Sequence, residues 1–198
     1  MSSIAPESFV HPGALIGKGA QIHPFAFIDD KVSVGERSII GQGAVLLSGV
    51  TVGPDCMVAP EAVLGSRGFG YVYDGQQHLR IPQVGSVEIG ENSRIGPATC
   101  LDRAALEVTS IGHHCEIGAF VQIGHNCKIS ENCQIGSGTG LAGSTVIGPR
   151  SKFGKRIGTV GHSNYGSDVV LEDLCGMTKT KVASGTRWSG YPAHRVQN

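Results

Sequence analysis

An all-β fold, a parallel β-helix built from hexapeptide repeats, is predicted by the spacing of aliphatic residues along the chain. An aliphatic side chain recurs at every sixth position from residue 4 to residue 64, usually followed by a glycine or another small residue. The period resumes at Ile89 and, after one offset, continues from Ile111 to Phe153. A fixed six-residue period with these residue types is typical of such a coil. Thirty glycines with only 6% aromatic residues also suit a chain that needs a tight corner after every strand.

Three consecutive hexads make one triangular coil, so the aliphatic positions fall in turn on three faces of a prism. We name these faces A, B and C, starting from Ile4, Val10 and Ile16. Residues 4–64 and 89–182 accommodate about eight to nine coils at a rise of roughly 4.8 Å per coil. We therefore expect one domain over residues 1–192, with a long loop insertion at 65–88 and a C-terminal tail at 193–198. Flat apolar walls predict self-association.

Charge and hydropathy exclude several classes of function. The net charge is zero, which gives no electrostatic reason for nucleic-acid binding. The basic residues are nevertheless concentrated after residue 144, where 8 Lys and Arg face 3 Asp and Glu, so the C-terminal end could dock an acidic partner. No stretch has the length of a transmembrane segment, and the first ten residues do not form a signal peptide. We expect a soluble, cytoplasmic protein.

The cysteines are predicted to fill space in the core as free thiols. Five of the six lie two residues before an aliphatic position of the repeat, where a small inward side chain is needed. No CxxC pair suggests a metal site, so no metal is expected. The five are Cys56, Cys115, Cys127, Cys133 and Cys175.

Both interruptions of the repeat follow face B. The first is residues 65–88, which come after Leu64, and the second is four extra residues before Ile111. Ile123 is the face-B position one coil further on. Insertions that gather on one edge of a repeat scaffold usually mark its functional surface. We therefore expect the site at this corner.

Counting by coils places several chemically useful residues at the same corner. His125 lies two residues after Ile123, Gly143 lies one coil above it, and Arg103 lies one coil below. His162 falls one residue beyond this column, two coils above His125. An imidazole can act as a general base near neutral pH, and a glycine N–H can approach a tetrahedral oxyanion closely. An exposed corner histidine can also be a plain surface residue, and we interpret His113 and His114 on face C in that way.

Five strings, in this order, resemble the UDP-3-O-acylglucosamine N-acyltransferase family of lipid A biosynthesis. The similarity extends over roughly residues 58–192. The strings are GFGY at 68–71, RIPQVG at 80–85, LDRAAL at 101–106, QIGHN at 122–126 and LAGS at 141–144. The resemblance implies a left-handed β-helix that forms a homotrimer with active sites between subunits.

The resemblance also implies roles for individual residues. His125 matches the general base, Gly143 the oxyanion-hole glycine, His162 a supporting histidine, and Asn126 the asparagine that follows the base. The implied donor is an acyl group carried by the phosphopantetheine of acyl carrier protein, and no separate cofactor is expected. The implied acceptor is a sugar or nucleotide-sugar. Five residues in the matching strings are candidates for substrate binding: Phe69, Tyr71, Asp102, Arg103 and Asn126.

The chain also departs from the family. The coil begins at Ile4, and the sequence stops soon after Tyr191-Pro192, so we expect a short form without the N-terminal uridine-binding domain and the C-terminal helix. Thr159 and Tyr165 replace aliphatic residues near His162, which predicts a different shape for the upper part of the pocket.

Three alternatives to N-acyl transfer stay open. The first is O-acylation or acetylation of a sugar with a coenzyme A thioester, which would use the same base. The second is zinc chemistry of the γ-carbonic anhydrase kind. The sequence argues against it, because no second histidine follows His125 at a ligand-like interval. The third is a non-catalytic trimeric scaffold.

Overall fold

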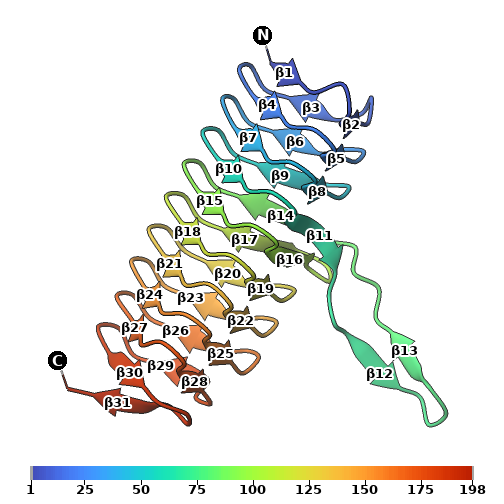
Figure 1. The fold of residues 1–198 in the computed structure, drawn as a ribbon. Helices are drawn as coiled ribbons and strands as arrows, with labels where there is room; N and C mark the ends of the chain where they lie inside the picture. Colours follow the sequence, from blue (N-terminus) through green and yellow to red (C-terminus); the bar gives the residue numbers. More distant parts are fainter. Residues whose placement is uncertain (1, 198) are drawn as a thin grey trace.

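The computed structural model describes residues 2–197, which form a three-faced prism of short parallel strands (Figure 1). Successive coils lie one above the other from the N-terminal to the C-terminal end. Each strand pairs in parallel with the strand one coil away, for example Gln21 with Ile39 and Ile22 with Ile40. The three faces of the prism are the three predicted faces, because every aliphatic position falls on the sheet to which counting assigned it.

Face A holds the longest sheet. Its strands are β1 (Ser3–Ile4), β4 (Gln21–Ile22), β7 (Ile39–Ile40), β10 (Met57–Val58), β15 (Arg94–Ile95), β18 (Glu116–Ile117), β21 (Gln134–Ile135), β24 (Lys152–Phe153), β27 (Val170–Leu171), β30 (Arg187–Ser189) and β31 (His194–Val196).

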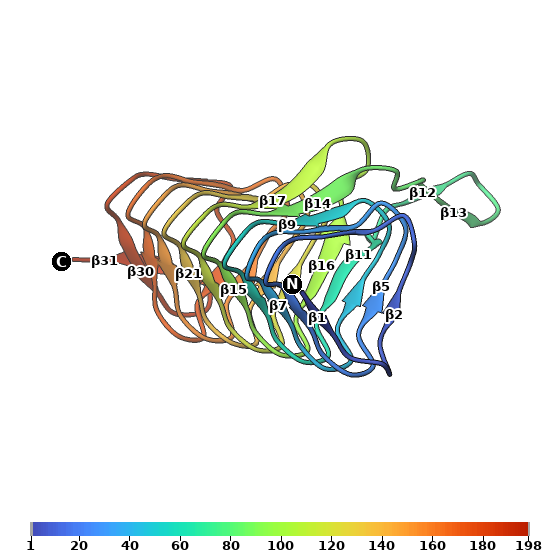
Figure 2. The same ribbon diagram turned by 90° about the horizontal axis from the view of Figure 1, so that it is seen from above.

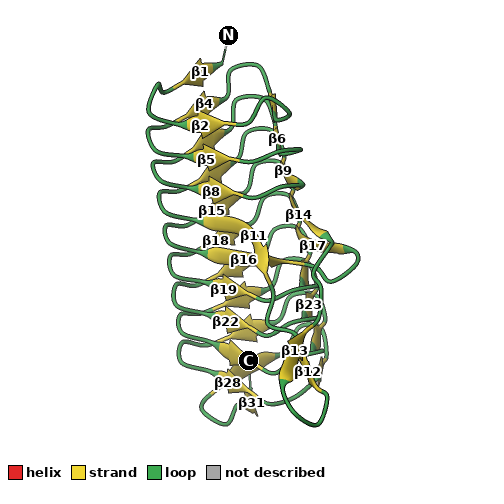
Figure 3. Ribbon diagram, turned by 90° about the vertical axis from the view of Figure 1, so that its right-hand side faces the viewer, coloured by secondary structure: helices red, strands yellow, loops and turns green. Residues whose placement is uncertain are grey.

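Faces B and C hold nine strands each, so the prism has nine coils with strands on all three faces (Figure 3). Face B consists of β2 (Phe9–Val10), β5 (Phe27–Ile28), β8 (Val45–Leu46), β11 (Val63–Arg67), β16 (Cys100–Arg103), β19 (Gln122–Ile123), β22 (Gly140–Leu141), β25 (Gly158–Thr159) and β28 (Gly176–Met177). Face C consists of β3 (Leu15–Ile16), β6 (Ser33–Val34), β9 (Val50–Val52), β14 (Ser86–Ile89), β17 (Val108–Ile111), β20 (Lys128–Ile129), β23 (Val146–Ile147), β26 (Asn164–Tyr165) and β29 (Lys181–Val182).

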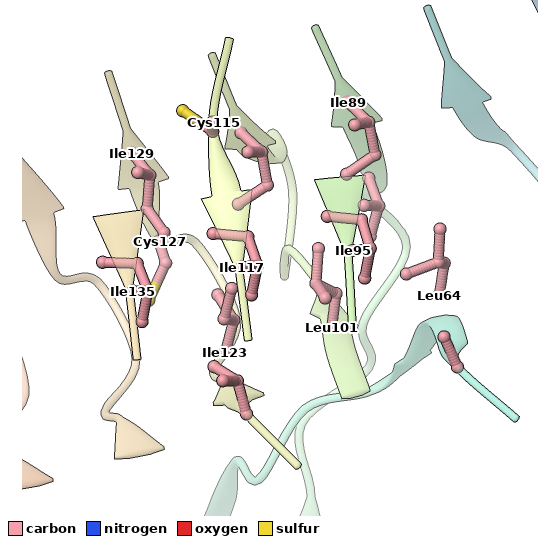
Figure 4. Packing of buried hydrophobic residues seen from close by; sticks show 14 of the residues in the cluster. Leu64, Ile89, Ile95, Leu101, Cys115, Ile117, Ile123, Cys127, Ile129 and Ile135 are labelled. Carbon is pink, nitrogen blue, oxygen red and sulfur yellow. The ribbon is translucent and has the colours of Figure 1, made fainter. Parts of the chain in front are cut away.

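The core is a single column of aliphatic side chains inside the prism. In Figure 4, side chains such as Ile95 and Ile117 from face A stack along the axis and meet Leu101 and Ile123 from face B. The five predicted cysteines are buried as free thiols, which confirms their role as fillers of the core. Burial raises the pKa of Cys127 to about 11, so this thiol stays protonated at neutral pH.

Thr159 and Tyr165, which replace aliphatic residues of the repeat, share one layer of the core with Phe153. Phe153 and Tyr165 pack edge to face at 5.0 Å between ring centroids, and the smaller Thr159 occupies face B of the same coil. The Thr159 hydroxyl accepts a hydrogen bond from the Ala142 N–H at 3.1 Å. Two aromatic rings therefore take the space that a third aliphatic side chain would need.

The loop insertion becomes a hairpin that stands away from the prism at the B–C corner (Figures 1 and 2). Strand β11 continues to Arg67 through an irregularity between Leu64 and Ser66, and coil pairing resumes at Ser86 in β14. Residues 68–85 therefore leave the coil. Within them, β12 (Tyr71–Tyr73) pairs antiparallel with β13 (His78–Arg80).

The two ends of the prism differ. Residue Ile4 of the first coil is 47% exposed, whereas Ile22, one coil further, is 2% exposed. At the other end the predicted tail folds back, and its residues 194–196 form β31 antiparallel to β30, beside the buried Trp188. Among residues 2–197 there is no helix that could cross a bilayer.

Candidate active site

The predicted column exists at the corner between faces B and C. The strand register aligns Leu101 with Ile123 and Ile123 with Leu141, so Arg103, His125 and Gly143 follow one another in successive coils. The Ser144 N–H donates to the His125 carbonyl at 2.8 Å, and the His162 N–H donates to the Gly143 carbonyl at 3.0 Å. His162 therefore lies opposite Ser144, one residue beyond the column, as counting predicted.

The His125 ring is packed between two glycines. A Cβ added to Gly143 would lie 2.7 Å from the His125 Nε2, and a Cβ added to Gly68 would lie 2.7 Å from the His125 Cβ. These separations are shorter than ordinary Cβ contacts, so a side chain at either position would displace His125. Gly68 comes from the root of the hairpin, so the insertion directly contacts the candidate base. Sequence reasoning identified Gly143 and singled out the aromatic pair after Gly68, but not the packing of Gly68 itself.

The orientation of His125 is set through its Nδ1 atom. The side-chain oxygen of Asn126 lies 3.1 Å from Nδ1, and the same oxygen accepts the Ala105 N–H at 2.9 Å. Because Ala105 donates, the Asn126 atom must be the amide oxygen, and His125 therefore carries its proton on Nδ1 when it is neutral. The lone pair of Nε2, beside Gly143, is then free to accept a proton. Asn126 adopts a left-handed backbone conformation, φ 60°, which asparagine tolerates well.

Gly143, whose Cα lies beside the His125 ring, has a backbone N–H without a protein partner in the described part of the chain. Within residues 2–197 this N–H donates to no protein acceptor, whereas the neighbouring Ala142 and Ser144 N–H groups are both hydrogen-bonded. This N–H is therefore free to donate a hydrogen bond to an oxyanion.

Asp102 and Arg103 both contact the root of the hairpin. The Asp102 carboxylate, 8% exposed, accepts hydrogen bonds from the Ser66 hydroxyl at 2.6 Å and the Gln122 side chain at 3.0 Å. Burial raises the pKa of Asp102, and the two hydrogen bonds and the nearby His125 oppose this effect. The Arg103 guanidinium donates to the carbonyls of Gly65 at 2.7 Å and Ser48 at 2.9 Å, and so anchors β11 where it leaves the coil.

A cavity of about 630 Å³ opens beside His125, between the prism and the hairpin. Two predicted residues line it, Phe69 and Tyr71, whose rings meet edge to face at 5.2 Å. The remaining lining residues are Gly70, His78 and Ile81. Sequence analysis missed His78 and Ile81, because only the pairing of β12 with β13 returns them to His125. We call this space the His125 cavity.

The other predicted residues have other surroundings. His162 is exposed, has a left-handed backbone with φ 56°, and does not line the His125 cavity. Its supporting role stays a prediction, as do the substrate-binding roles of Asp102, Arg103 and Asn126. Within the described part of the chain, no three His, Cys, Asp or Glu residues are grouped closely enough to hold a metal ion.

The repeat is matched by a family model, "Bacterial transferase hexapeptide (six repeats)", at residues 13–48, 31–66 and 108–143. The chain belongs to this hexapeptide-repeat family.

The expected resemblance to UDP-3-O-acylglucosamine N-acyltransferases is confirmed among curated proteins. The protein of that name from Methylorubrum extorquens strain PA1 is 37% identical over 151 residues, which are 76% of this chain and 43% of the relative. The protein of that name from Herminiimonas arsenicoxydans is 35% identical over 69% of this chain and 39% of the relative. The matches thus span less than half the length of these relatives.

Solved structures confirm the fold class, a left-handed parallel β-helix. The UDP-N-acetylglucosamine O-acyltransferase of Moraxella catarrhalis superposes with a TM-score of 0.88 at 21% identity, over 98% of this chain and 73% of that one. A UDP-N-acetylglucosamine acyltransferase from Bacteroides fragilis gives 0.85 at 22% identity, with the same coverage. At these identities the likeness concerns the fold.

Proposed function

We propose that this protein transfers an acyl group from a thioester to the amine of a sugar-type acceptor, with His125 as the general base. The observation that carries the proposal is the His125 ring, held between Gly68 and Gly143 with Nδ1 engaged by Asn126 and Nε2 free. The similarity to N-acyltransferases supports an amine as the acceptor.

The chemistry follows from this arrangement. The acceptor nitrogen attacks the thioester carbonyl carbon while His125 Nε2 takes its proton, and the Gly143 N–H donates to the oxyanion that forms. The tetrahedral intermediate then collapses, the C–S bond breaks, and the imidazolium returns the proton to the departing thiolate. The products are an amide and a free thiol, so no additional cofactor is needed. The donor would be a phosphopantetheine thioester on acyl carrier protein or coenzyme A.

A homotrimer is part of the proposal. Flat faces of short strands leave apolar side chains at the surface, for example Leu15 of β3 at 70% and Phe9 of β2 at 50% exposure. Packing three prisms side by side would cover such side chains. A neighbouring subunit at the B–C corner would also enclose the His125 cavity.

The test replaces His125 and compares it with a histidine on another corner. His125→Ala should lower turnover by at least roughly 10²–10⁴-fold, since general-base catalysis contributes that much. His113→Ala, an exposed histidine, should leave turnover unchanged. Turnover is measured with acyl carrier protein thioesters and coenzyme A thioesters, against amine and hydroxyl acceptors. Full turnover in His125→Ala would refute the proposed base, and transfer to hydroxyl acceptors alone would replace N-acylation by O-acylation.

A further inference from the structure

A second cavity, of about 330 Å³, lies at the root of the hairpin and is lined by Arg67, Arg80, Pro82, Gln83 and Val84. We call it the arginine cavity. It does not share a lining residue with the His125 cavity, but the two are neighbours. The Arg80 guanidinium donates through Nη2 to the Tyr71 hydroxyl at 2.8 Å, and the Tyr71 ring lines the His125 cavity.

The arginine cavity has an uncompensated positive charge. Within residues 2–197, four arginines form ion pairs with carboxylates: Arg37, Arg94, Arg150 and Arg187. Neither Arg67 nor Arg80 does so, although they line one cavity. A third arginine, Arg103, is the register partner of Arg67. The carboxylate of the adjacent Asp102 is occupied by Ser66 and Gln122. Like charges that share a cavity repel each other unless an anion lies between them.

The Arg80 side chain is also held in place before any ligand arrives. Its Nε and Nη2 both donate to the Tyr71 hydroxyl, and its guanidinium carbon lies 5.4 Å from the centre of the Tyr71 ring. These contacts orient the guanidinium but leave its charge unneutralised. An oriented, planar guanidinium suits a phosphoryl group, which it can bind through two parallel hydrogen bonds.

Gln83 connects the arginine cavity to the candidate base. It is 8% exposed, and its buried Oε1 atom has no hydrogen-bond partner in the described part of the chain. A Cβ added to Gly68 would lie 3.0 Å from this Oε1 and 3.0 Å from the His125 Cδ2. The Gln83 amide and the Gly68 backbone therefore form the partition between the arginine cavity and the His125 ring. An anion in the arginine cavity would be separated from His125 only by the Gln83 amide and the Gly68 backbone.

We propose that Arg67 and Arg80 form a binding site for a phosphoryl group of one of the two substrates. The identity of the ligand rests on the proposed function with a nucleotide-sugar as the acceptor. The donor then offers the phosphopantetheine phosphate, and the acceptor offers its diphosphate. The site itself rests on the two arginines and their cavity.

The first experiment measures binding of inorganic pyrophosphate by isothermal titration calorimetry. Arg67→Gln and Arg80→Gln should each weaken binding by about tenfold or more, because each removes a charged hydrogen-bond donor. Arg156→Gln is the matched control, since Arg156 is an exposed arginine on the corner between faces A and B and has no carboxylate partner among residues 2–197. Affinity in the wild type should also fall as salt is added. Binding that is absent, or insensitive to both substitutions, or equally weakened by Arg156→Gln, would overturn the inference.

The second experiment distinguishes the two sources of the phosphoryl group. With the same variants in steady-state assays, a raised KM for the nucleotide-sugar alone assigns the site to the acceptor. A raised KM for the thioester alone assigns it to the donor, and unchanged KM values for both would contradict the inference. His125→Ala separates this inference from the proposed function, because it should bind pyrophosphate as the wild type does. If no substrate turns over even in the wild type, the proposed function fails, and the pyrophosphate titration alone decides on the site.

Discussion

At the scale of single residues, the site depends on two glycines, Gly68 and Gly143, as much as on the larger side chains around them. The His125 imidazole fits only because residues 68 and 143 have no Cβ, and its orientation follows from one amide oxygen, that of Asn126. Gly68 does no chemistry itself but limits where the ring can lie. It is therefore a positioning residue, and its substitution separates geometry from chemical identity.

Gly68→Ala should lower kcat by roughly a hundredfold, because the new methyl group would displace the His125 ring from the position in which it can take the acceptor's proton. Gly140→Ala serves as the control, since a Cβ at Gly140 meets nothing within 4 Å. Steady-state kinetics and thermal melting are measured for both. Equal kcat values in the two variants would show that Gly68 does not position the base.

At the scale of elements, each coil tolerates substitution only if its three inward residues together fill the prism. The Phe153, Thr159 and Tyr165 layer follows this rule, since two large rings accompany one small residue. The Tyr165 hydroxyl is buried and has no hydrogen-bond partner of normal geometry within residues 2–197, and burial raises the pKa of this phenol. The layer therefore combines close packing with a polar group that costs stability.

Thr159→Leu should destabilise the protein by about 1–3 kcal/mol, because the larger side chain overpacks this layer and the Ala142 N–H loses its acceptor. Chemical denaturation monitored by circular dichroism measures the change. Unchanged stability would mean that the layer contains space that the two rings do not fill.

Tyr165→Phe should leave stability unchanged or raise it by up to about 1 kcal/mol, because it removes an unpaired buried hydroxyl and keeps the ring. The same denaturation measurement applies. A loss of more than about 1 kcal/mol would show that the hydroxyl has a partner in solution.

At the scale of the whole molecule, the prism exposes more surface than a compact monomer of its mass. Its accessible surface is 9818 Å², whereas the usual scaling for a 20.6 kDa monomer gives roughly 8,900 Å². An elongated prism with flat faces is therefore suited to lateral packing. Light scattering after gel filtration should give a mass about three times 20.6 kDa. A monomeric mass at working concentration would contradict the homotrimer.

The six-residue spacing alone determined most of the architecture. It assigned each aliphatic residue to a face, predicted the buried cysteines, and placed His125, Gly143 and both interruptions at one corner. It could do so because a regular coil converts separation in sequence directly into position in space. These predictions concern residues inside the repeat and the points at which the repeat is interrupted.

Only the tertiary structure decided what the insertion does. Residues 68–85 do not follow the six-residue period, so no counting rule could place Gly68 against His125 or bring His78 and Ile81 to the cavity. The same holds for Arg67 and Arg80, which lie thirteen positions apart in sequence but line one cavity. The physical reason is that a hairpin's path depends on its own strand pairing and on side-chain contacts at its root, such as those of Arg103 with Gly65 and Ser48. These are long-range interactions, and the local pattern of the sequence does not contain them.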